Sequence, residues 1–551
     1  MTGIRLTAPA PGWAIDADVV VVGSGVCGAM VAHEAVRAGL SVLILEAGPR
    51  GERGDYWQRF MSLPADNRAR GDMQSPFPQS PYAPFPMFGN DDYLILKGRD
   101  AGAFRQGYLR VVGGTTWHWS GLCWRHLPVD LRLKSTYGVG RDWAISYEDL
   151  EPYYTKAESE MGVSGPSDPA MQSPSQRSAP YAMESIAYGT ADRRFADVAT
   201  RGGYRCVPIP QAKNSRSYDD RPGCCGSNSC MPICPIGALY NGMVHVNKAT
   251  KLGASLVDQA VVYRIDTDDR NRVTAVHYYD RNKQSQRVTG RTFVIAANGI
   301  ETPRLLLYAA NSRNPRGIAN SSDQVGRNMM DHPGIHMSCI TKEPMWTGHG
   351  PVQQSSIVDF RDGAFRSEYC ANRIMMNNQS MAASAGVTAV SMGLVGKRLD
   401  AEIRRRAACT LDFSIGFEVL PEPGNRLTLS SEHKDALGIP HPEVTYDVGD
   451  YVRKGGDKVR PTLQHIASLL EATDVKITDA YNANNHVMGG AIMGRDPNNS
   501  VVDADCRTHD HENLYIAGGA TMPSASCINS TLSMVAVSLM MADRLKQAMK
   551  S

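Results

Sequence analysis

The sequence predicts an α/β protein that combines an open, mostly parallel sheet with a second domain of α+β type. An apolar run at 19–22 opens a strand, turn, helix, strand unit, and "RTFVIAANGIETPRLLLYAA" at 291–310 has the pattern of another buried strand followed by a helix. The sheet is therefore expected to be discontinuous in the chain. Between about 336 and 480, short alternating stretches such as "RLTLS" and "PEVTYDV" are mixed with charged helical runs, which predicts a separate antiparallel sheet with helices.

The first unit carries the pattern of a Rossmann-like dinucleotide site. Gly23 permits the tight turn, Gly25 lets the pyrophosphate approach the backbone, and Gly28 lets the helix pack closely. Glu46 ends the second strand, where it can accept a hydrogen bond from a ribose hydroxyl. The pattern alone does not decide between FAD and NAD.

Size and composition limit the classes of function that the chain can have. A chain of 551 residues exceeds what one core usually serves, so two or more domains are expected. The net charge of +2 lacks the basic excess that binds nucleic acid. Residues 1–18 lack the apolar core of a secretory signal, and no apolar run approaches the ~20 residues that span a bilayer. Membrane contact is therefore expected only through partners.

Two further segments have no regular periodicity. Residues 50–100 are rich in proline, aromatic and acidic residues, which predicts an irregular loop. Residues 164–220 are rich in proline and serine and lead into a cysteine cluster, which indicates an excursion from the main sheet. His509 and His511 have a metal-like spacing but no third ligand nearby, and a surface turn is expected there.

The cysteine cluster "GCCGSNSCMPICPIG" at 223–237 contains Cys224, Cys225, Cys230 and Cys234. Thiols at this density indicate zinc, an iron-sulfur cluster or a disulfide. The adjacent pair disfavours the two C-x2-C pairs of common zinc sites. The ending "CMPICP" repeats the C-x3-C-P close of bacterial iron-sulfur sequences. Three ligands with C-x5-C-x3-C spacing suffice for three irons, and a fourth would permit a [4Fe-4S] cluster.

Six motifs occur in order along the chain. They are the glycine unit, "GGTTWHWSG" at 113–121, "DWAISYEDLEPYYTKAE" at 142–158, "GIETPRLLL" at 299–307, "VGRNMMDHPG" at 325–334, and "NNHVMGGAIMG" with "NLYIAGGATMPSASCINSTL" near the end. Together they resemble the glucose-methanol-choline (GMC) family of FAD oxidoreductases, and the resemblance covers nearly the whole chain. It implies a discontinuous FAD-binding domain at 16–130, 235–335 and 480–550. The implied iron-sulfur excursion is 131–234 and the substrate-binding domain 336–479.

Within that family, the cysteine cluster resembles the large catalytic subunits of bacterial membrane-bound sugar dehydrogenases, which act on glucose, gluconate, sorbitol or, nearest in overall resemblance, fructose. The resemblance implies a heterotrimer with a small subunit that carries the export signal and a multihaem cytochrome c subunit. Electrons would pass from FAD through a [3Fe-4S] cluster held by Cys224, Cys230 and Cys234 to the cytochrome and the quinone pool. The expected location is the periplasmic face of the bacterial inner membrane.

The resemblance also implies roles for single residues. His486 matches the catalytic histidine, a base that suits alcohol oxidation, and Asn529 matches its partner, which holds the substrate oxygen. A helix after Asn529 would present its N-terminus to the flavin ring. The other implied FAD contacts are Gly113, Gly114, Thr115, Thr116, His118, Val262, Ala297, Gly519, Ala520, Ser530 and Thr531.

Three positions remain open at this point. His118 is expected either to bond covalently to the flavin or to donate or accept a hydrogen bond. His332 is expected to be structural or to line the flavin pocket. Gly518 stands where the family usually has an aspartate, so one flavin contact is in doubt.

Three rival functions are weighed. The first rival is an oxidase of the same fold, a function that would not explain the cysteine cluster. A nicotinamide-dependent dehydrogenase has no use for "GGTTWHW" or His486. The third rival is a non-catalytic binding protein stapled by zinc, and a metal analysis that found iron instead of zinc would exclude it.

Overall fold

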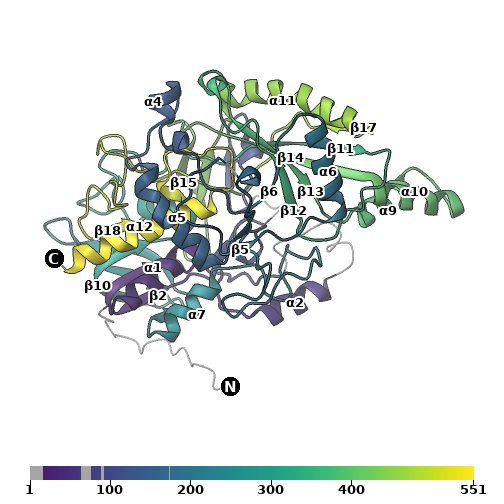
Figure 1. Ribbon diagram of the computed structural model, residues 1–551. Helices are drawn as coiled ribbons and strands as arrows, with labels where there is room; N and C mark the ends of the chain where they lie inside the picture. Colours follow the sequence, from purple (N-terminus) through teal and green to yellow (C-terminus); the bar gives the residue numbers. More distant parts are fainter. Residues whose placement is uncertain (1–16, 64–75, 88–91, 173, 551) are drawn as a thin grey trace.

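The computed structural model describes residues 17–63, 76–87, 92–172 and 174–550 and shows a mixed α/β fold, as the sequence predicts (Figure 1). Among these residues, the largest sheet has seven strands and the next has six. The first sheet lies beneath α1, α7 and α12 in the lower left of Figure 1, and the second lies in the upper right. The domain boundaries given above remain predictions.

Separated parts of the chain build the larger sheet. β1 pairs in parallel with both β2 and β10, and β18 pairs in parallel with β10. The strand order is β7-β2-β1-β10-β9-β8, with β18 on β10. The strands are β1 (Ala17–Val22), β2 (Val42–Leu45), β7 (Ser255–Val257), β8 (Val261–Thr267), β9 (Val273–Tyr279), β10 (Ser285–Ile295) and β18 (Leu514–Ile516).

Burial explains the apolar runs in this sheet. β2 and β18 are buried throughout, because helices cover both faces of a parallel sheet. The long strand β10 changes partners along its length: its first half pairs antiparallel with β9, and its second half pairs in parallel with β1 and β18. The helices of this part are α1 (Val26–Arg37), α5 (Tyr147–Met161), α7 (Met243–Lys251), α8 (Asn298–Tyr308) and α12 (Thr531–Lys550).

The second sheet is antiparallel and has the order β17-β11-β14-β13-β12-β6. Its edge strand β6 comes from the segment between the first two parts of the nucleotide sheet. The strands are β6 (Cys206–Pro208), β11 (Gly334–Ile340), β12 (Gln353–Ile357), β13 (Asn372–Asn377), β14 (Thr410–Phe417) and β17 (Thr473–Ile477). Helices α6 (Thr190–Arg201) and α11 (Gly449–Leu469) pack against it.

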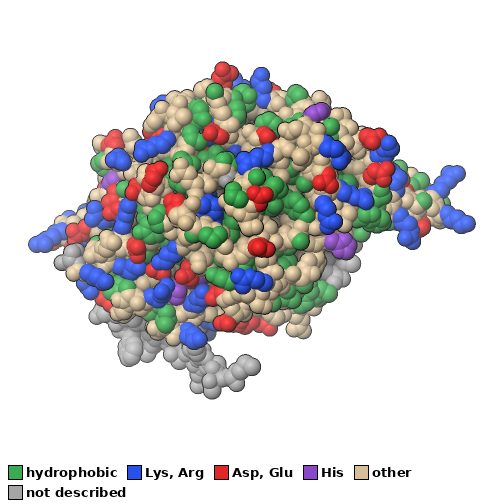
Figure 2. All heavy atoms as spheres, viewed as in Figure 1, with side chains coloured by type: hydrophobic (Ala, Val, Ile, Leu, Met, Phe, Trp, Pro, Cys, Tyr) green, Lys and Arg blue, Asp and Glu red, His purple; other side chains and the backbone are tan. Residues whose placement is uncertain are grey.

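A helical hairpin, α9 (Ala382–Ser391) and α10 (Gly396–Cys409), projects from the body beside the second sheet (Figure 1). Basic side chains stand at its outer end in the space-filling view (Figure 2). In the part of the chain that the structure describes, no helix is both long and apolar enough to cross a bilayer.

The prediction of an irregular loop over residues 50–100 is wrong in part. Helix α2 (Arg53–Ser62) lies there, with Tyr56 buried against Phe77 and Trp117, and strand β3 (Ile95–Lys97) pairs in parallel with β16. The partner strand is more than 300 residues away in the chain, so local periodicity does not reveal it. Residues 64–75 and 88–91 of this segment lie outside the described residues.

The remaining elements are short or lie at the edges of the two sheets. They are α4 (Leu133–Tyr137), β4 (Ser164–Gly165), β5 (Met183–Glu184), β15 (Arg426–Lys434), β16 (Pro440–Thr445), and the 3-10 helices η1 (Ala101–Phe104), η2 (Gly114–Trp117), η3 (Pro128–Leu131), η4 (Pro169–Met171), η5 (Ala364–Ser367) and η6 (Gly519–Thr521).

The prediction of a surface turn at His509 and His511 is also wrong in part. His511 is 1% exposed, and its Nε2 accepts the Ala319 N–H at 3.0 Å. Its Nδ1 lies 2.6 Å from the carbonyl oxygen of Asn271. The imidazole therefore joins three distant backbone segments, a role that sequence spacing cannot indicate.

Candidate functional site

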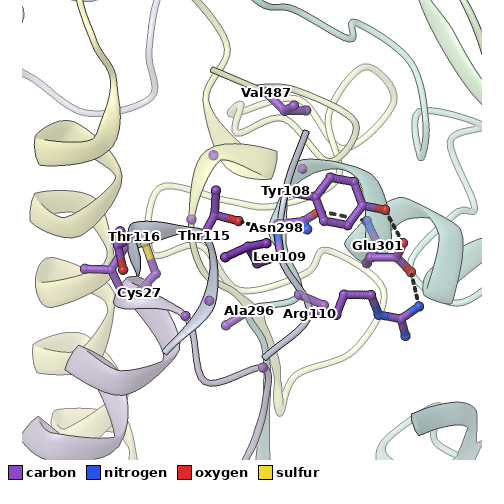
Figure 3. Close-up of a pocket in the computed structure, with 18 of the residues that line it drawn as sticks. Cys27, Tyr108, Leu109, Arg110, Thr115, Thr116, Ala296, Asn298, Glu301 and Val487 are labelled. Atoms are coloured by element: carbon purple, nitrogen blue, oxygen red, sulfur yellow. Dashed lines mark hydrogen bonds and ion pairs between the residues drawn. The ribbon is translucent and has the colours of Figure 1, made fainter. Parts of the chain in front are cut away.

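A cavity of about 330 Å³ opens at the carboxyl ends of β1 and β10 (Figure 3). In an open α/β sheet this edge is where ligands bind. Most residues expected to hold the flavin or substrate line the cavity. They are Gly23, Gly25, Glu46, Gly114, Thr115, Thr116, His118, Val262, Ala297, His486, Gly519, Asn529, Ser530 and Thr531. Gly28, Gly113 and Ala520 are not among the lining residues.

The three glycines of the first turn meet different steric demands. A Cβ on Gly23 would lie 2.5 Å from the Ala296 carbonyl oxygen, and one on Gly28 would lie 2.0 Å from the Gly23 carbonyl oxygen. A Cβ on Gly25 would meet nothing within 4 Å, so its backbone is open toward the cavity. Gly25 also precedes the first residue of α1, whose N-terminal amides favour an anion.

Glu46 already has several partners inside the protein. One carboxylate oxygen accepts the Ser24 N–H at 2.9 Å and the Ser24 hydroxyl at 2.6 Å, and the other accepts the Gly48 N–H at 3.0 Å. Burial raises the pKa of Glu46, and these hydrogen bonds oppose the rise. A carboxylate has about four acceptor positions, so room remains for a ribose hydroxyl.

Buried polar atoms without partners line the cavity. His118 Nε2, Asn529 Oδ1 and Ser530 Oγ are enclosed, and none has a hydrogen-bond partner within the described chain. Leaving such groups unsatisfied costs about 1–3 kcal/mol each, so they indicate a polar ligand. With the open backbone at Gly25 and the start of the 20-residue helix α12, they fit a flavin nucleotide. Burial lowers the pKa of His118 to about 4, which leaves its ring neutral.

Gly518 lines the same cavity, and its φ of 99° lies in the left-handed region that favours glycine. A Cβ there would lie 3.6 Å from Cys27 Sγ, which is ordinary contact. Backbone strain, rather than lack of space, therefore opposes a side chain at this position.

A buried ionic network that the sequence does not reveal closes one side of the cavity (Figure 3). Tyr93 and Tyr108 both donate to Glu301, and Arg304 lies 3.0 Å from the same carboxylate. Burial alone would raise the pKa of Glu301, but the guanidinium groups of Arg110 and Arg304 lower it to about 2. These residues come from the chain before the double glycine and from α8.

The two residues expected to be catalytic are brought together. Asn529 Nδ2 lies 2.8 Å from His486 Nε2, although 43 positions separate the residues. Desolvation lowers the pKa of His486 well below its usual value, and His332 and Arg373 lower it further. A neutral imidazole beside a hydrogen-bonding amide can take a proton from an alcohol.

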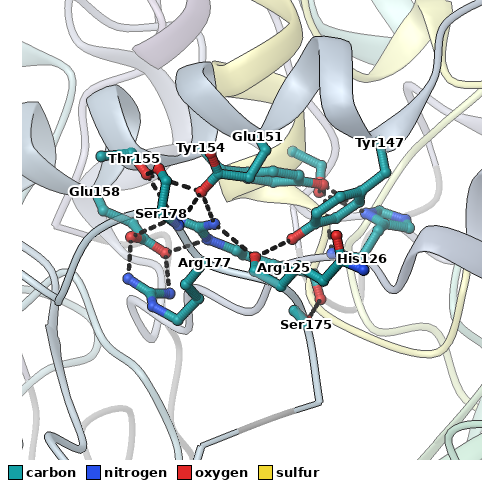
Figure 4. A network of polar contacts seen from close by, with 12 residues as sticks. Arg125, His126, Tyr147, Glu151, Tyr154, Thr155, Glu158, Ser175, Arg177 and Ser178 are labelled. Carbon is teal, nitrogen blue, oxygen red and sulfur yellow. Dashed lines mark hydrogen bonds and ion pairs between the residues drawn. The ribbon is translucent and has the colours of Figure 1, made fainter.

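A second network, which sequence reasoning also missed, links Arg125 and His126 to α5 (Figure 4). His126 Nδ1 lies 2.5 Å from the Ser533 hydroxyl in the first turn of α12. The preceding Arg125 lies 2.8 Å from the carboxylates of both Glu151 and Glu158 on α5. This side-chain contact joins α12 to the buried ionic network on α5.

The cysteine cluster lies next to the cavity. Trp119 and Met231 line the cavity and also pack against the cluster of Cys230, Leu239 and Val352. Cys230 is buried, Cys224 is half-buried, and Cys225 is exposed. All four thiols of the cluster are free in this structure.

Cys234 is half-buried and packs against the buried cluster that contains Cys230. The Gly226 N–H points to Cys224 Sγ at 3.5 Å.

Among the described residues, one group of potential metal ligands lies outside the cavity. His33, Glu160 and His245 bring ligand atoms within 4.8 Å of one another. Arg37 and Lys248 lie 3.8 and 3.7 Å from the Glu160 carboxylate, and His245 Nε2 lies 3.0 Å from it. Basic side chains thus already balance this carboxylate.

Comparison with known proteins identifies the family. The family described as GMC oxidoreductase matches residues 17–334 and 421–538. The chain belongs to the GMC oxidoreductase family. Among its relatives, the fructose dehydrogenase large subunit of Gluconobacter japonicus is 55% identical and aligns over 97% of this chain and 99% of its own. The 2-methyl-1,2-propanediol dehydrogenase of Mycolicibacterium austroafricanum is 27% identical over 96% and 94%.

Two solved structures share the fold. Pyridoxine 4-oxidase from Mesorbium loti superposes with a TM-score of 0.62 at 16% identity, covering 96% of this chain and 98% of its own. Formate oxidase superposes with a TM-score of 0.64 at 15% identity, covering 98% and 99%. The family prediction and the prediction of an FAD-dependent oxidoreductase acting on CH–OH groups are confirmed. A non-catalytic binding protein and a nicotinamide-dependent enzyme are thereby excluded.

Proposed function

We propose that this chain is the catalytic subunit of a sugar dehydrogenase whose substrate is D-fructose, oxidised to 5-keto-D-fructose. The observation that carries the proposal is the 55% identity to a fructose dehydrogenase large subunit over nearly the whole of both chains. The alternatives are glucose, gluconate and sorbitol. The gluconate 2-dehydrogenase flavoprotein of Pantoea cypripedii is more distant, at 23% identity.

The chemistry follows from the pair His486 and Asn529. Oxidation of an alcohol removes the hydroxyl proton and the hydride on carbon, and bound FAD supplies the hydride acceptor. His486 takes the proton because its ring is neutral. Asn529 holds the substrate oxygen, since its amide already lies 2.8 Å from the base. The N-terminus of α12 follows directly and favours negative charge in the cavity.

Two unpartnered acceptors favour a substrate with several hydroxyl groups. Gln106 Oε1 and Asn529 Oδ1 both line the cavity side of the site and have no partner within the described residues. A sugar offers hydroxyl donors beside the reacting carbon, whereas a simple alcohol would leave both acceptors unsatisfied. A site built to bind such hydroxyls rejects analogues that lack them.

The substrate proposal is tested by presenting fructose, glucose, gluconate and sorbitol to the purified protein with an artificial one-electron acceptor. Fructose is expected to give the highest kcat/KM, with a diketone as product. A higher kcat/KM for one of the other three would replace fructose with that substrate. Oxygen consumption equal to substrate consumption, without the acceptor, would favour an oxidase instead.

We further propose that Cys224, Cys230 and Cys234 hold a [3Fe-4S] cluster that passes electrons singly to a cytochrome c subunit. A [4Fe-4S] cluster is the alternative. The position of Trp119 and Met231 between the cavity and Cys230 supports this proposal. Iron analysis of anaerobically purified protein is expected to find about three irons per chain. Zinc without iron would overturn the cluster.

The assembly that accompanies this activity is also proposed. A small subunit with the export signal and a multihaem cytochrome c subunit would hold this chain at the periplasmic face of the inner membrane. The name of the 55% identical relative, a large subunit, supports an assembly of several chains. Affinity purification of this chain from its native cells is expected to recover both partners. Recovery of this chain alone from the soluble fraction would contradict the assembly.

The orphan Nε2 of His118 makes this residue our candidate for a covalent bond to FAD. Acid precipitation separates the alternatives. Yellow colour that stays with the pellet supports the covalent bond. Release of all flavin to the supernatant would show that His118 does not bond to FAD covalently and leaves it only a hydrogen-bonding role. The variant His118→Ala is expected to release its flavin in the same assay.

A further inference from the structure

A row of four groups connected by hydrogen bonds leads into the site. His332 Nε2 lies 3.1 Å from the Ala525 carbonyl oxygen, and His332 Nδ1 lies 3.1 Å from His486 Nδ1. His486 Nε2 lies 2.8 Å from Asn529 Nδ2. His332 is fully buried, whereas His486 is partly exposed toward the cavity.

The carbonyl at the end of the row fixes the direction of each bond. A carbonyl oxygen only accepts, so His332 Nε2 must carry the proton. A neutral imidazole has one N–H, which makes His332 Nδ1 an acceptor. His486 Nδ1 must then donate to it, and His486 Nε2 is left without a proton. The amide N–H of Asn529 donates to that free nitrogen, which agrees with the unpartnered Oδ1 on the same side chain.

The surroundings keep both rings neutral, as this assignment requires. Burial lowers the pKa of His332 to about 3, and the Arg373 guanidinium lowers it further, although hydrogen bonds to the backbone act in the opposite direction. Arg373 is itself buried and donates to the Cys527 carbonyl oxygen at 2.7 Å. The carboxylate of Asp331 accepts hydrogen bonds from the backbone N–H groups of His332 and His486, at 2.6 and 2.8 Å.

We propose that His332 is a positioning residue that fixes His486 as the Nδ1–H tautomer, so that Nε2 is the atom that receives the substrate proton. This inference rests on the proposed function. With FAD bound, the substrate O–H proton would move to His486 Nε2 while the hydride on carbon went to the flavin and a C=O bond formed. In the free protein, the Asn529 N–H stands where the substrate hydroxyl would donate.

Three variants separate the two hydrogen bonds of His332. His332→Asn keeps an acceptor where Nδ1 lies, His332→Gln keeps a donor where Nε2 lies, and His332→Phe keeps ring volume with neither. The rate of flavin reduction by substrate is expected to stay within about tenfold of wild type for Asn and to fall by about 10² or more for Gln and Phe, because a wrong tautomer disables a catalytic histidine. FAD content is expected to be unchanged. Wild-type rates in His332→Gln and His332→Phe would overturn the proposal.

A second measurement does not depend on turnover. Long-range 1H–15N correlation spectra of the holoenzyme with labelled histidine report which ring nitrogen of His486 carries the proton, with the His486→Gln spectrum giving the assignment. A protonated Nδ1 and an unprotonated Nε2 are expected in wild type, and a protonated Nε2 would overturn the proposal even if His332→Phe fails to fold. If no sugar reduces the flavin, the proposed function fails, and the spectra still decide the role of His332.

Discussion

Replacing His486 with alanine removes the proposed base while leaving the glycine-rich part of the flavin site untouched. The ring lies 2.8 Å from the Asn529 amide and 3.1 Å from His332, so only these two side-chain hydrogen bonds are lost. Loss of a general base slows the reaction by about 10²- to 10⁴-fold. The barrier to hydride transfer is therefore expected to rise by about 3–5 kcal/mol. FAD is expected to remain bound.

Stopped-flow flavin absorbance under anaerobic conditions, with fructose in excess, measures this rate directly. His511→Ala is the control, because His511 is a buried histidine that is held by backbone hydrogen bonds and does not line the cavity. It is expected to lower stability and leave the rate of flavin reduction within a few-fold of wild type. A His486→Ala variant that bleaches at the wild-type rate would remove this histidine from the mechanism.

Three further outcomes are expected. The pKa of Glu301 is lowered from 4.5 to about 2, so its ionisation adds about 3 kcal/mol of stability above pH 4.5 that is lost as pH falls to 2. Because the pKa values of Glu151 and Glu160 are also lowered to about 2, denaturant titrations are expected to show a smaller acid loss of stability in Glu301→Gln than in wild type, and equal losses would contradict this. Gly28→Ala is expected to overpack the turn and to weaken FAD binding about 5- to 150-fold, as measured by fluorescence titration. Gly54→Ala has open space around the new methyl group and is expected to bind FAD normally, so equal affinities of the two variants would contradict the steric argument. Cys230→Ser is expected to lose cluster iron, and Cys225→Ser, an exposed neighbour, to retain it; equal iron contents would contradict the ligand assignment.

The pH dependence of flavin reduction follows from the direction of the His486 pKa. Because its pKa is lowered, the neutral base is already present well below pH 6.5 and persists as pH rises. The rate is therefore expected to be flat from about pH 6.5 upward and to fall only in acid. A fall in rate with a midpoint above pH 7 would contradict the neutral, buried base.

Some parts of the fold are predictable because their signal is local. The strand at 17–22 is buried on both faces from Val19 to Val22, so apolar residues run without interruption there, and the turn that follows requires glycine for steric reasons at Gly23 and Gly28. Strand β10 at 285–295 likewise ends in buried apolar residues, in the half that pairs in parallel with β1 and β18. These features need no knowledge of distant contacts.

Other parts depend on contacts between distant residues. β3 is exposed or half-buried and gains its ladder only from β16, so its residues carry no strong strand pattern. The contact of His332 with His486 spans 154 positions, and the motif "MDHPG" gives no sign of it. The contacts of the Glu301 carboxylate are equally absent from the local sequence pattern, because its tyrosine partners lie about 200 positions away.

The most direct test of the account is one anaerobic turnover of the iron-loaded protein with fructose, followed by flavin absorbance and by EPR. Fructose is expected to bleach the flavin and to change the EPR spectrum of the cluster. In Cys230→Ser, the flavin is expected to bleach at the wild-type rate with no cluster signal. A flavin that stays oxidised with fructose, glucose, gluconate and sorbitol alike would contradict the account.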